Sequence, residues 1–226
     1  MLAVLRRAMA LLIGLVIFVG LPLLSWGVGE VRGFVDDPAR LVYMPLVIML
    51  QVFVLITMPD AGRNRGTRRK DVPRRRLDLA AIQVISLAVL IIPPYSDRRD
   101  VVVLSGIEIV RYLGLVMFAL GMLTMQWAEA SLGKQFSAEV TLQEGHQLIT
   151  GGLYRYLRHP RYLGIIVFTA GISLVFRSWL GVILGAVLAL ILIWRIGVEE
   201  DLLHHEFGAA WEDYSHTSWR LIPFVY

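Results

Sequence analysis

The stretch 146–164 gathers side chains that can hydrogen-bond or stack. Within these 19 residues lie two histidines, three tyrosines, three arginines and a pair of adjacent glycines. Pro160 stands where a helix can begin, because its missing N–H is not needed in a first turn. A helix beginning there would direct free backbone N–H groups at the preceding loop, which favours an anionic or carboxylate group. An interfacial anchor, with Tyr and Arg at the level of the lipid headgroups, is the alternative interpretation.

A second polar group of residues follows the last long apolar run. Arg195 and Glu199 stand four residues apart, so they share one face of a helix. A carboxylate there can accept hydrogen bonds from an amine or a hydroxyl, and a guanidinium can orient an acidic group. Alternatively, Arg195 reaches the interface and pairs with Glu199 only to be satisfied. The stretch that follows is amphipathic and places four residues on one face: Leu203, Phe207, Ala210 and Tyr214.

Composition and spacing disfavour several other chemistries. The chain has no cysteine, which excludes disulfides, zinc-thiolate sites and cysteine nucleophiles. His205 and Glu206 begin an H-E-x-x-H pattern, but the second histidine position is Ala209. The formal net charge is +4, yet the charges form short clusters between long apolar runs, which is typical of a membrane protein. We therefore expect no metal and no nucleic-acid partner.

Membrane-spanning helices must position these residues. Apolar residues make up 57% of the 226-residue chain and charged residues only 18%, against about 25% charged in a typical soluble domain. A helix needs about 17 to 25 mostly apolar residues to cross the hydrocarbon core. The sequence thus predicts an all-α, polytopic transmembrane protein with about six crossings: 8–24, 41–58, 77–92, one within 101–127, 162–176 and 179–196.

The charges between these runs predict the orientation. Placing the N-terminus inside puts 16 of the 22 Lys and Arg residues on the inner side and 5 on the outer side, so both termini are expected in the cytoplasm. Arg177 and Ser178 alone separate the last two crossings, so Tyr162 and Ile196 should lie on the same side. The loop before the fifth crossing and the acidic helix after the sixth are then neighbours that can enclose a pocket at the membrane surface.

We expect a multi-pass protein that resides in a prokaryotic plasma membrane. The first apolar run, preceded by Arg6 and Arg7, also resembles the start of a secretory signal. No small-x-small cleavage site follows Leu24, so a crossing is favoured over a signal.

Two separate motifs resemble a known family. The first is G-G-L-Y-R-Y-L-R-H-P-R-Y-L-G at 151–164, and the second is E-E-D-L-L-H-H-E-F-G-A-A-W-E-D-Y at 199–214 with R-L-I-P at 220–223. In this order around a hairpin, they resemble the superfamily of isoprenylcysteine carboxyl methyltransferases and phospholipid methyltransferases. These are integral-membrane enzymes that use S-adenosylmethionine. The resemblance implies a methyltransferase core at 128–226, preceded at 1–127 by about four transmembrane helices.

The resemblance also implies residue roles. The arginine one turn before the acidic pair, here Arg195, faces the methyl acceptor and is the implied catalytic residue. A family member with prenylated substrates carries glutamine where this chain has Glu139, so that contact is not carried over. The positions that line the methyl-donor site in the family are here His146, Gln147, Leu148, Ile149, Tyr154, His159, Pro160, Arg161, Tyr162 and Glu199.

The expected function is methyl transfer from S-adenosylmethionine to an amphiphilic or apolar acceptor that enters laterally from the bilayer. A prenylated cysteine carboxylate, a lipid amine and a small thiol all fit the family, so the acceptor stays open, and membrane lipids are the other expected partners. Methyl transfer is a direct displacement that needs the acceptor lone pair in line with the methyl group. Positioning and water exclusion then supply most of the rate, and neither a metal nor a protein nucleophile is required.

Two other functions remain alternatives. Membrane sterol reductases share a related H-P-x-Y-x-G stretch and bind a reduced nicotinamide cofactor, but they usually carry asparagine and an acidic residue where this chain has Arg161 and Ile165. A transporter, or a purely structural membrane protein, is the second alternative. Transport sites usually show ionisable groups at mid-membrane depth. Glu108 and Arg111 are three residues apart near the outer end of a crossing and are expected to pair with each other instead.

Overall fold

The computed structural model is described here for residues 2–57, 75–105, 108–132 and 148–226. The described residues are helical apart from their turns and loops, and they contain only isolated β-bridges. The expectation of an all-α protein is confirmed. The helices are α1 (Leu2–Leu15), α2 (Leu21–Trp26), α3 (Val31–Val35), α4 (Pro38–Thr57), α5 (Arg75–Arg99), α6 (Ile109–Leu132), α7 (Pro160–Val175), α8 (Trp179–Phe207) and α9 (Ala209–Thr217), with short π or 3-10 segments η1 (Val16–Gly20), η2 (Val28–Glu30) and η4 (Gly152–Arg155).

Five helical segments of the described chain are long and apolar enough to cross a membrane. The expected third crossing is longer than predicted, because α5 continues through Pro93 and Pro94 to Arg99 and has 25 residues. The expected fifth crossing is α7, which has only 16 residues and is a shorter apolar helix. The prediction of a polytopic membrane protein is therefore confirmed, with α7 below the usual spanning length.

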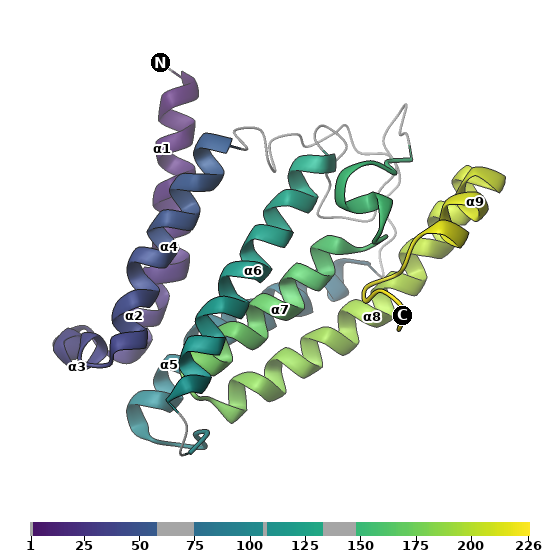
Figure 1. Ribbon diagram of the computed structural model, residues 1–226. Helices are drawn as coiled ribbons and strands as arrows, with labels where there is room; N and C mark the ends of the chain where they lie inside the picture. The colour runs from purple at the N-terminus through teal and green to yellow at the C-terminus, as the bar shows by residue number, and fades with distance from the viewer. Residues whose placement is uncertain (1, 58–74, 106–107, 133–147) are drawn as a thin grey trace.

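Helices α6, α7 and α8 lie side by side at the centre of the molecule, with α5 behind them and α1, α2 and α4 along one flank (Figure 1). Glycines let α6 and α7 touch backbone to backbone. A Cβ atom built on Gly121 of α6 would lie 2.3 Å from the backbone nitrogen of Phe168, and one built on Gly171 of α7 would lie 2.3 Å from that of Phe118. Any side chain at these positions would force the two helices apart.

Aromatic side chains join the flank to the central helices. The rings of Tyr43 in α4 and Phe118 in α6 lie 5.2 Å apart, and those of Phe18 in η1 and Phe168 in α7 lie 5.7 Å apart. Tyr43 also donates a hydrogen bond of 2.6 Å to the carbonyl of Phe18. Rings of this size bury much apolar area, so the first half of the chain is packed onto the second.

A tight turn joins α7 to α8, as the sequence predicted. Arg177 has φ of 44°, and Ser178 caps α8 by accepting a hydrogen bond of 3.1 Å from the backbone N–H of Gly181. The two helices therefore run in opposite directions, and the start of α7 lies toward the same end of the bundle as the end of α8 (Figure 1).

A buried cluster of charges lies at the opposite end, beside this turn. The carboxylate of Asp97 has no exposed side-chain surface and binds Arg40 at 2.8 Å, Arg111 at 2.7 Å and Arg177 at 3.1 Å. Arg111 also binds Asp37 at 3.0 Å. The expected pair of Arg111 with Glu108 is therefore wrong, because Arg111 instead binds Asp97 of α5 and Asp37 of the turn between α3 and α4. We call these five residues, Asp97, Asp37, Arg40, Arg111 and Arg177, the turn cluster.

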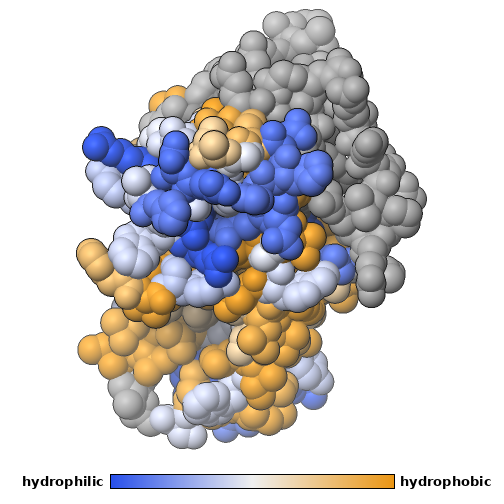
Figure 2. Space-filling model, turned by 90° about the vertical axis from the view of Figure 1, so that its right-hand side faces the viewer, coloured by the Kyte–Doolittle hydropathy of each residue, from blue (hydrophilic) through white to orange (hydrophobic). Residues whose placement is uncertain are grey.

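The amphipathic stretch predicted over residues 203–214 is not one continuous helix. Gly208 has φ of 50°, a conformation that favours glycine, and it separates α8, which ends at Phe207, from α9. The predicted single apolar face through Leu203 and Tyr214 is therefore wrong. On the side of the molecule where Figure 1 draws α8 and α9, hydrophilic side chains gather above a broad apolar band (Figure 2).

Candidate active site

The loop before α7 is held by the C-terminal tail, residues 218–226. The backbone N–H of Arg158 donates to the carbonyl of Trp219 at 2.7 Å, and that of His159 donates to the carbonyl of Arg220 at 3.0 Å. In return, the N–H of Trp219 donates to the carbonyl of Tyr156 at 2.9 Å. This short parallel pairing fixes the backbone that carries His159.

Glu200 joins the loop, the tail and α8. Its carboxylate, in a residue only 8% exposed, accepts from Arg158 Nε at 2.8 Å and from Arg220 Nε at 2.8 Å, and lies 3.3 Å from His159 Nε2. Charge-assisted bonds of this length are the strong ones in proteins. The sequence analysis assigned Glu200 no role of its own, and its place in the E-E pair was the signal that could have indicated one.

The first turn of α7 places an aromatic pair at the site. Pro160 is the first helical residue, as predicted, and His159 precedes it. The rings of His159 and Tyr162 are stacked, with centroids 5.6 Å apart and planes within 3° of each other. Both residues are buried. The sequence-predicted residues His159, Pro160 and Tyr162 thus lie together at the start of α7.

Helix α8 is joined to Tyr162 by a chain of hydrogen bonds. Arg195 Nε donates to the hydroxyl of Tyr162 at 2.9 Å, and this hydroxyl donates to Glu199 Oε2 at 2.7 Å. Arg195 is only 4% exposed, whereas Glu199 is partly exposed. The two polar groups that the sequence placed on either side of the hairpin therefore meet at a shared hydroxyl.

Two further tyrosines, from η4 and α9, belong to the candidate site. Tyr154 in η4 is buried, and its backbone carbonyl accepts a hydrogen bond of 2.7 Å from the hydroxyl of Tyr214 in α9. Burial, together with the negative charge of Glu199, raises the pKa of Tyr154 far above its usual range. Burial also raises the pKa of Tyr214 to about 12. Both phenols are therefore neutral hydrogen-bond donors near pH 7.

Arg161 is directed toward α6. Its Nε donates to Glu129 Oε1 at 2.9 Å, a partner that the sequence did not indicate, because Glu129 lies 32 residues earlier. Leu148 and Ile149 are half-buried in the non-helical segment that leads to η4. The other expected donor-site residues, His146 and Gln147, lie outside the described part of the chain, as does Glu139.

Comparisons with known proteins agree with the resemblance seen in the motifs. A family model for phospholipid methyltransferases matches residues 109–210. A probable protein-S-isoprenylcysteine O-methyltransferase from rice, Oryza sativa subsp. indica, is 26% identical over 164 residues, which cover 70% of this chain and 84% of that protein. The protein-S-isoprenylcysteine O-methyltransferase of Schizosaccharomyces pombe is 31% identical over 118 residues, and there the match spans only 48% of the relative.

The fold agrees with a solved structure as well. The eukaryotic intramembrane Ras methyltransferase, an isoprenylcysteine carboxyl methyltransferase, aligns with a TM-score of 0.56 over 99% of this chain and 77% of that chain, at 21% identity. The helical bundle is that of a polytopic integral-membrane protein, and the relatives that the chain matches in sequence are methyltransferases. In sequence and in fold the chain is similar to the isoprenylcysteine carboxyl methyltransferases and phospholipid methyltransferases. These relatives are eukaryotic, so they give no support to the expected prokaryotic membrane.

Proposed function

We propose that this protein transfers a methyl group from S-adenosylmethionine to a carboxylate on a lipophilic acceptor of the isoprenylcysteine type. The observation that carries the proposal is the hydrogen-bonded chain from Arg195 through the Tyr162 hydroxyl to Glu199. It places a buried cation and a partly exposed carboxylate on the two sides of one phenol. Such a pair can hold a cationic donor and an anionic acceptor next to each other.

The residues of the first turn of α7 and of η4 fit the donor. Glu199 can accept from the amine or the ribose hydroxyls. The rings of Tyr154, Tyr162 and His159 can stack on adenine or face the sulfonium, a cation–π contact worth about 0.5 to 2 kcal/mol. The expected contacts of His146, Gln147, Leu148 and Ile149 belong to this same proposal. When bound, S-adenosylmethionine supplies an electrophilic methyl group, which the acceptor oxygen takes as the carbon–sulfur bond breaks.

Arg195 favours a carboxylate over the other acceptors. A buried guanidinium attracts an acidic acceptor and orients it with planar N–H groups, whereas it repels a protonated lipid amine. It also keeps the acceptor ionised, so its oxygen retains the lone pair that attacks the methyl group. We further infer that the acceptor arrives from the bilayer, that the site faces the cytoplasm, and that both chain termini lie on that side.

Binding and turnover of site variants test the residue roles. We expect Glu199→Gln and His159→Ala to lose S-adenosylmethionine binding by calorimetry on detergent-purified protein, while Arg195→Ala keeps binding and loses turnover. Glu206→Gln, an equivalent change on the exposed end of α8, is the matched control and should change neither. Unchanged donor affinity in both Glu199→Gln and His159→Ala would refute the assignment.

The acceptor is tested by radiolabelled methyl transfer into three substrates, namely a farnesylcysteine analogue, phosphatidylethanolamine and a long-chain thiol. Only the first should be labelled, and its label should be released as methanol by mild base, as expected for a methyl ester. Base-stable label in the lipid amine or the thiol would contradict the carboxylate acceptor and leave the donor-site proposal standing.

A further inference from the structure

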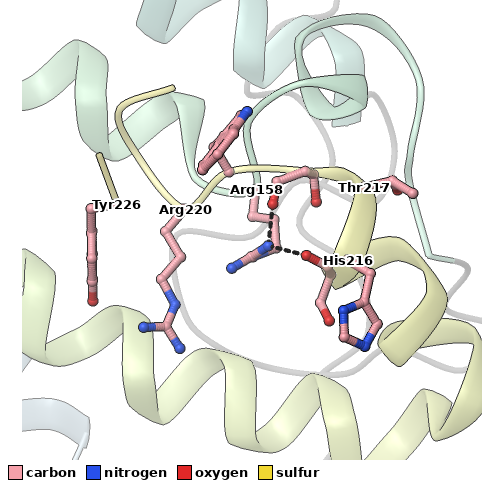
Figure 3. A pocket seen from close by; sticks show the side chains of 8 residues that line it. Arg158, His216, Thr217, Arg220 and Tyr226 are labelled. Atoms are coloured by element: carbon pink, nitrogen blue, oxygen red, sulfur yellow. Dashed lines mark hydrogen bonds between the residues drawn. The ribbon is translucent and has the colours of Figure 1, made fainter. Parts of the chain in front are cut away.

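Beside the candidate active site, α9, the C-terminal tail and the loop before α7 form an open hollow of about 440 Å³. It is lined by Arg158, Arg220, His216, Trp219 and Tyr226 together with three hydroxyl side chains of the segment 215–218. None of the lining residues is acidic. Figure 3 shows the side chain of Arg158 between Arg220 on one side and His216 on the other. The volume is in the range of sites for small ligands.

We propose that this hollow binds a phosphate group, as carried by an anionic phospholipid at the membrane surface or by free phosphate. Arginine is the residue best suited to this task, because its planar guanidinium matches phosphate oxygens with paired N–H donors. The hydroxyls and the imidazole of His216 add further donors. The proposal does not depend on the methyltransferase activity proposed above.

The charge balance around the hollow favours an anion. Arg158 and Arg220 both bind the single carboxylate of Glu200, so two positive charges share one negative charge among these three residues. Arg158 uses its Nε on Glu200 and its Nη1 on the carbonyls of Ser215 and Ser218. A guanidinium has five N–H groups, so within the described chain these three bonds leave donors for a ligand. Arg220 is 41% exposed at its side chain and is reachable from solvent.

The hollow adjoins the proposed donor site at Glu200, which lies 3.3 Å from His159, but its lining includes none of His159, Tyr162 or Glu199. Adjacent residues on a helix point about 100° apart, so Glu199 and Glu200 leave α8 in different directions. Glu199 binds Tyr162 of α7, whereas Glu200 binds Arg158 and Arg220, which line the hollow. A ligand in the hollow therefore sits on the tail side of Glu200.

The depth of the hollow matches the phosphate layer of a bilayer. Helix α8 begins at Trp179, and Glu200 is 21 residues further, or at most about 32 Å along the helix axis. This is close to the roughly 30 Å thickness of the hydrocarbon core, which places the guanidiniums bound to Glu200 at headgroup level. Phe224 and Val225 of the adjacent tail are 86% and 76% exposed, as expected of side chains that lie in a lipid interface.

Calorimetric titration of the detergent-purified full chain tests the proposal with three probes: dihexanoylphosphatidylglycerol, dihexanoylphosphatidylcholine and inorganic phosphate. We expect saturable one-site binding of the anionic lipid and at least tenfold weaker binding of the zwitterionic lipid. Equal affinity for inorganic phosphate would identify free phosphate as the source of the ligand, and weak phosphate binding would identify the lipid. Equal binding of the two lipids, or no saturable binding of any probe, would overturn the proposal.

Variants locate the binding to the hollow. Arg220→Gln should lower the affinity for the anionic lipid at least tenfold. Arg220→Lys should recover part of this loss because it restores the charge. Arg155→Gln, which removes an exposed arginine of η4 that does not line the hollow, should change the affinity less than twofold. His216→Glu changes an exposed position of α9 that lines the hollow, so it provides a second test if Arg220→Gln fails to fold. It should also lower the affinity tenfold, because it adds a negative charge. Equal losses in the Arg155 and Arg220 variants would refute the site.

Discussion

The two ends of the α7–α8 hairpin both combine arginines with carboxylates, but they arrange them differently. In the turn cluster, three guanidiniums surround the fully buried carboxylate of Asp97. At the other end, a neutral phenol stands between Arg195 and the partly exposed Glu199. A buried charge is tolerated only when it is paired and hydrogen-bonded. The first arrangement therefore satisfies its charges within the protein, and the second leaves one carboxylate partly exposed, as the proposed donor contact requires.

The largest effect should come from the turn cluster. Asp97→Asn removes the negative charge that three arginines share, and an uncompensated buried charge costs about 3 to 5 kcal/mol. We expect this loss in the free energy of unfolding, measured by denaturant titration in detergent micelles. Asp100→Asn is the matched control. The side chain of Asp100 is 80% exposed, and its ion pair with Arg177 is long, at 3.9 Å. A loss below about 1 kcal/mol for Asp97→Asn, the range typical of exposed pairs, would mean that the cluster is not a closed structural unit.

An intermediate effect is expected at Glu200, which is buried like the turn cluster but belongs to the site end. Glu200→Gln keeps the shape and removes the charge that Arg158 and Arg220 share. Hydrogen bonds to charged groups contribute about 1.5 to 3 kcal/mol, so we expect a loss of about 2 kcal/mol in unfolding free energy. Hydrogen exchange should also become faster at the amides of Arg158 and His159. Glu212→Gln, on an exposed pair with His204, should leave these amides unchanged.

The smallest effect on stability, with a clear effect on turnover, is expected at Tyr162. Tyr162→Phe removes only the hydroxyl that lies between Arg195 and Glu199. We expect turnover to fall about tenfold, equivalent to about 1.4 kcal/mol, with a change of about 1 kcal/mol in the free energy of unfolding. Steady-state methyl transfer and denaturant titration on the same preparation check both values. A loss of stability as large as that of Asp97→Asn would remove the contrast between the two ends.

Local sequence pattern was sufficient for the parts of the fold that depend on neighbouring residues. The apolar runs predicted the crossings, and the two-residue turn at Arg177 and Ser178 brought the start of α7 and the end of α8 together. Because the helix face shared by Arg195 and Glu199 is a local property, their meeting with the α7 residues followed from the same reasoning. The break at Gly208 was not predicted, since a glycine inside an apolar pattern does not by itself end a helix.

Contacts between distant segments could not be predicted in this way. Asp97 binds three arginines from three other parts of the chain. Glu200 binds Arg158, which lies 42 positions earlier in a loop, and Arg220, which lies 20 positions later in the tail. Such partners are set by how the helices pack, which single-residue spacing does not specify. The pairing of Glu129 with Arg161 is another such contact, and it is made possible by the close approach of α6 and α7.

That close approach has a consequence for how a lipophilic molecule reaches the interior. Sliding α6 along α7 would move their glycines out of register and bring bulky side chains against the facing backbone, so the two helices form one rigid block. This block carries the ion pair of Glu129 with Arg161 and the ring of Tyr162. His159, which stacks on Tyr162, directly precedes α7. For the proposed lipophilic acceptor, we therefore expect its hydrocarbon chain to be admitted by displacement of α8, α9 or the residues after Thr217 rather than by separation of α6 from α7.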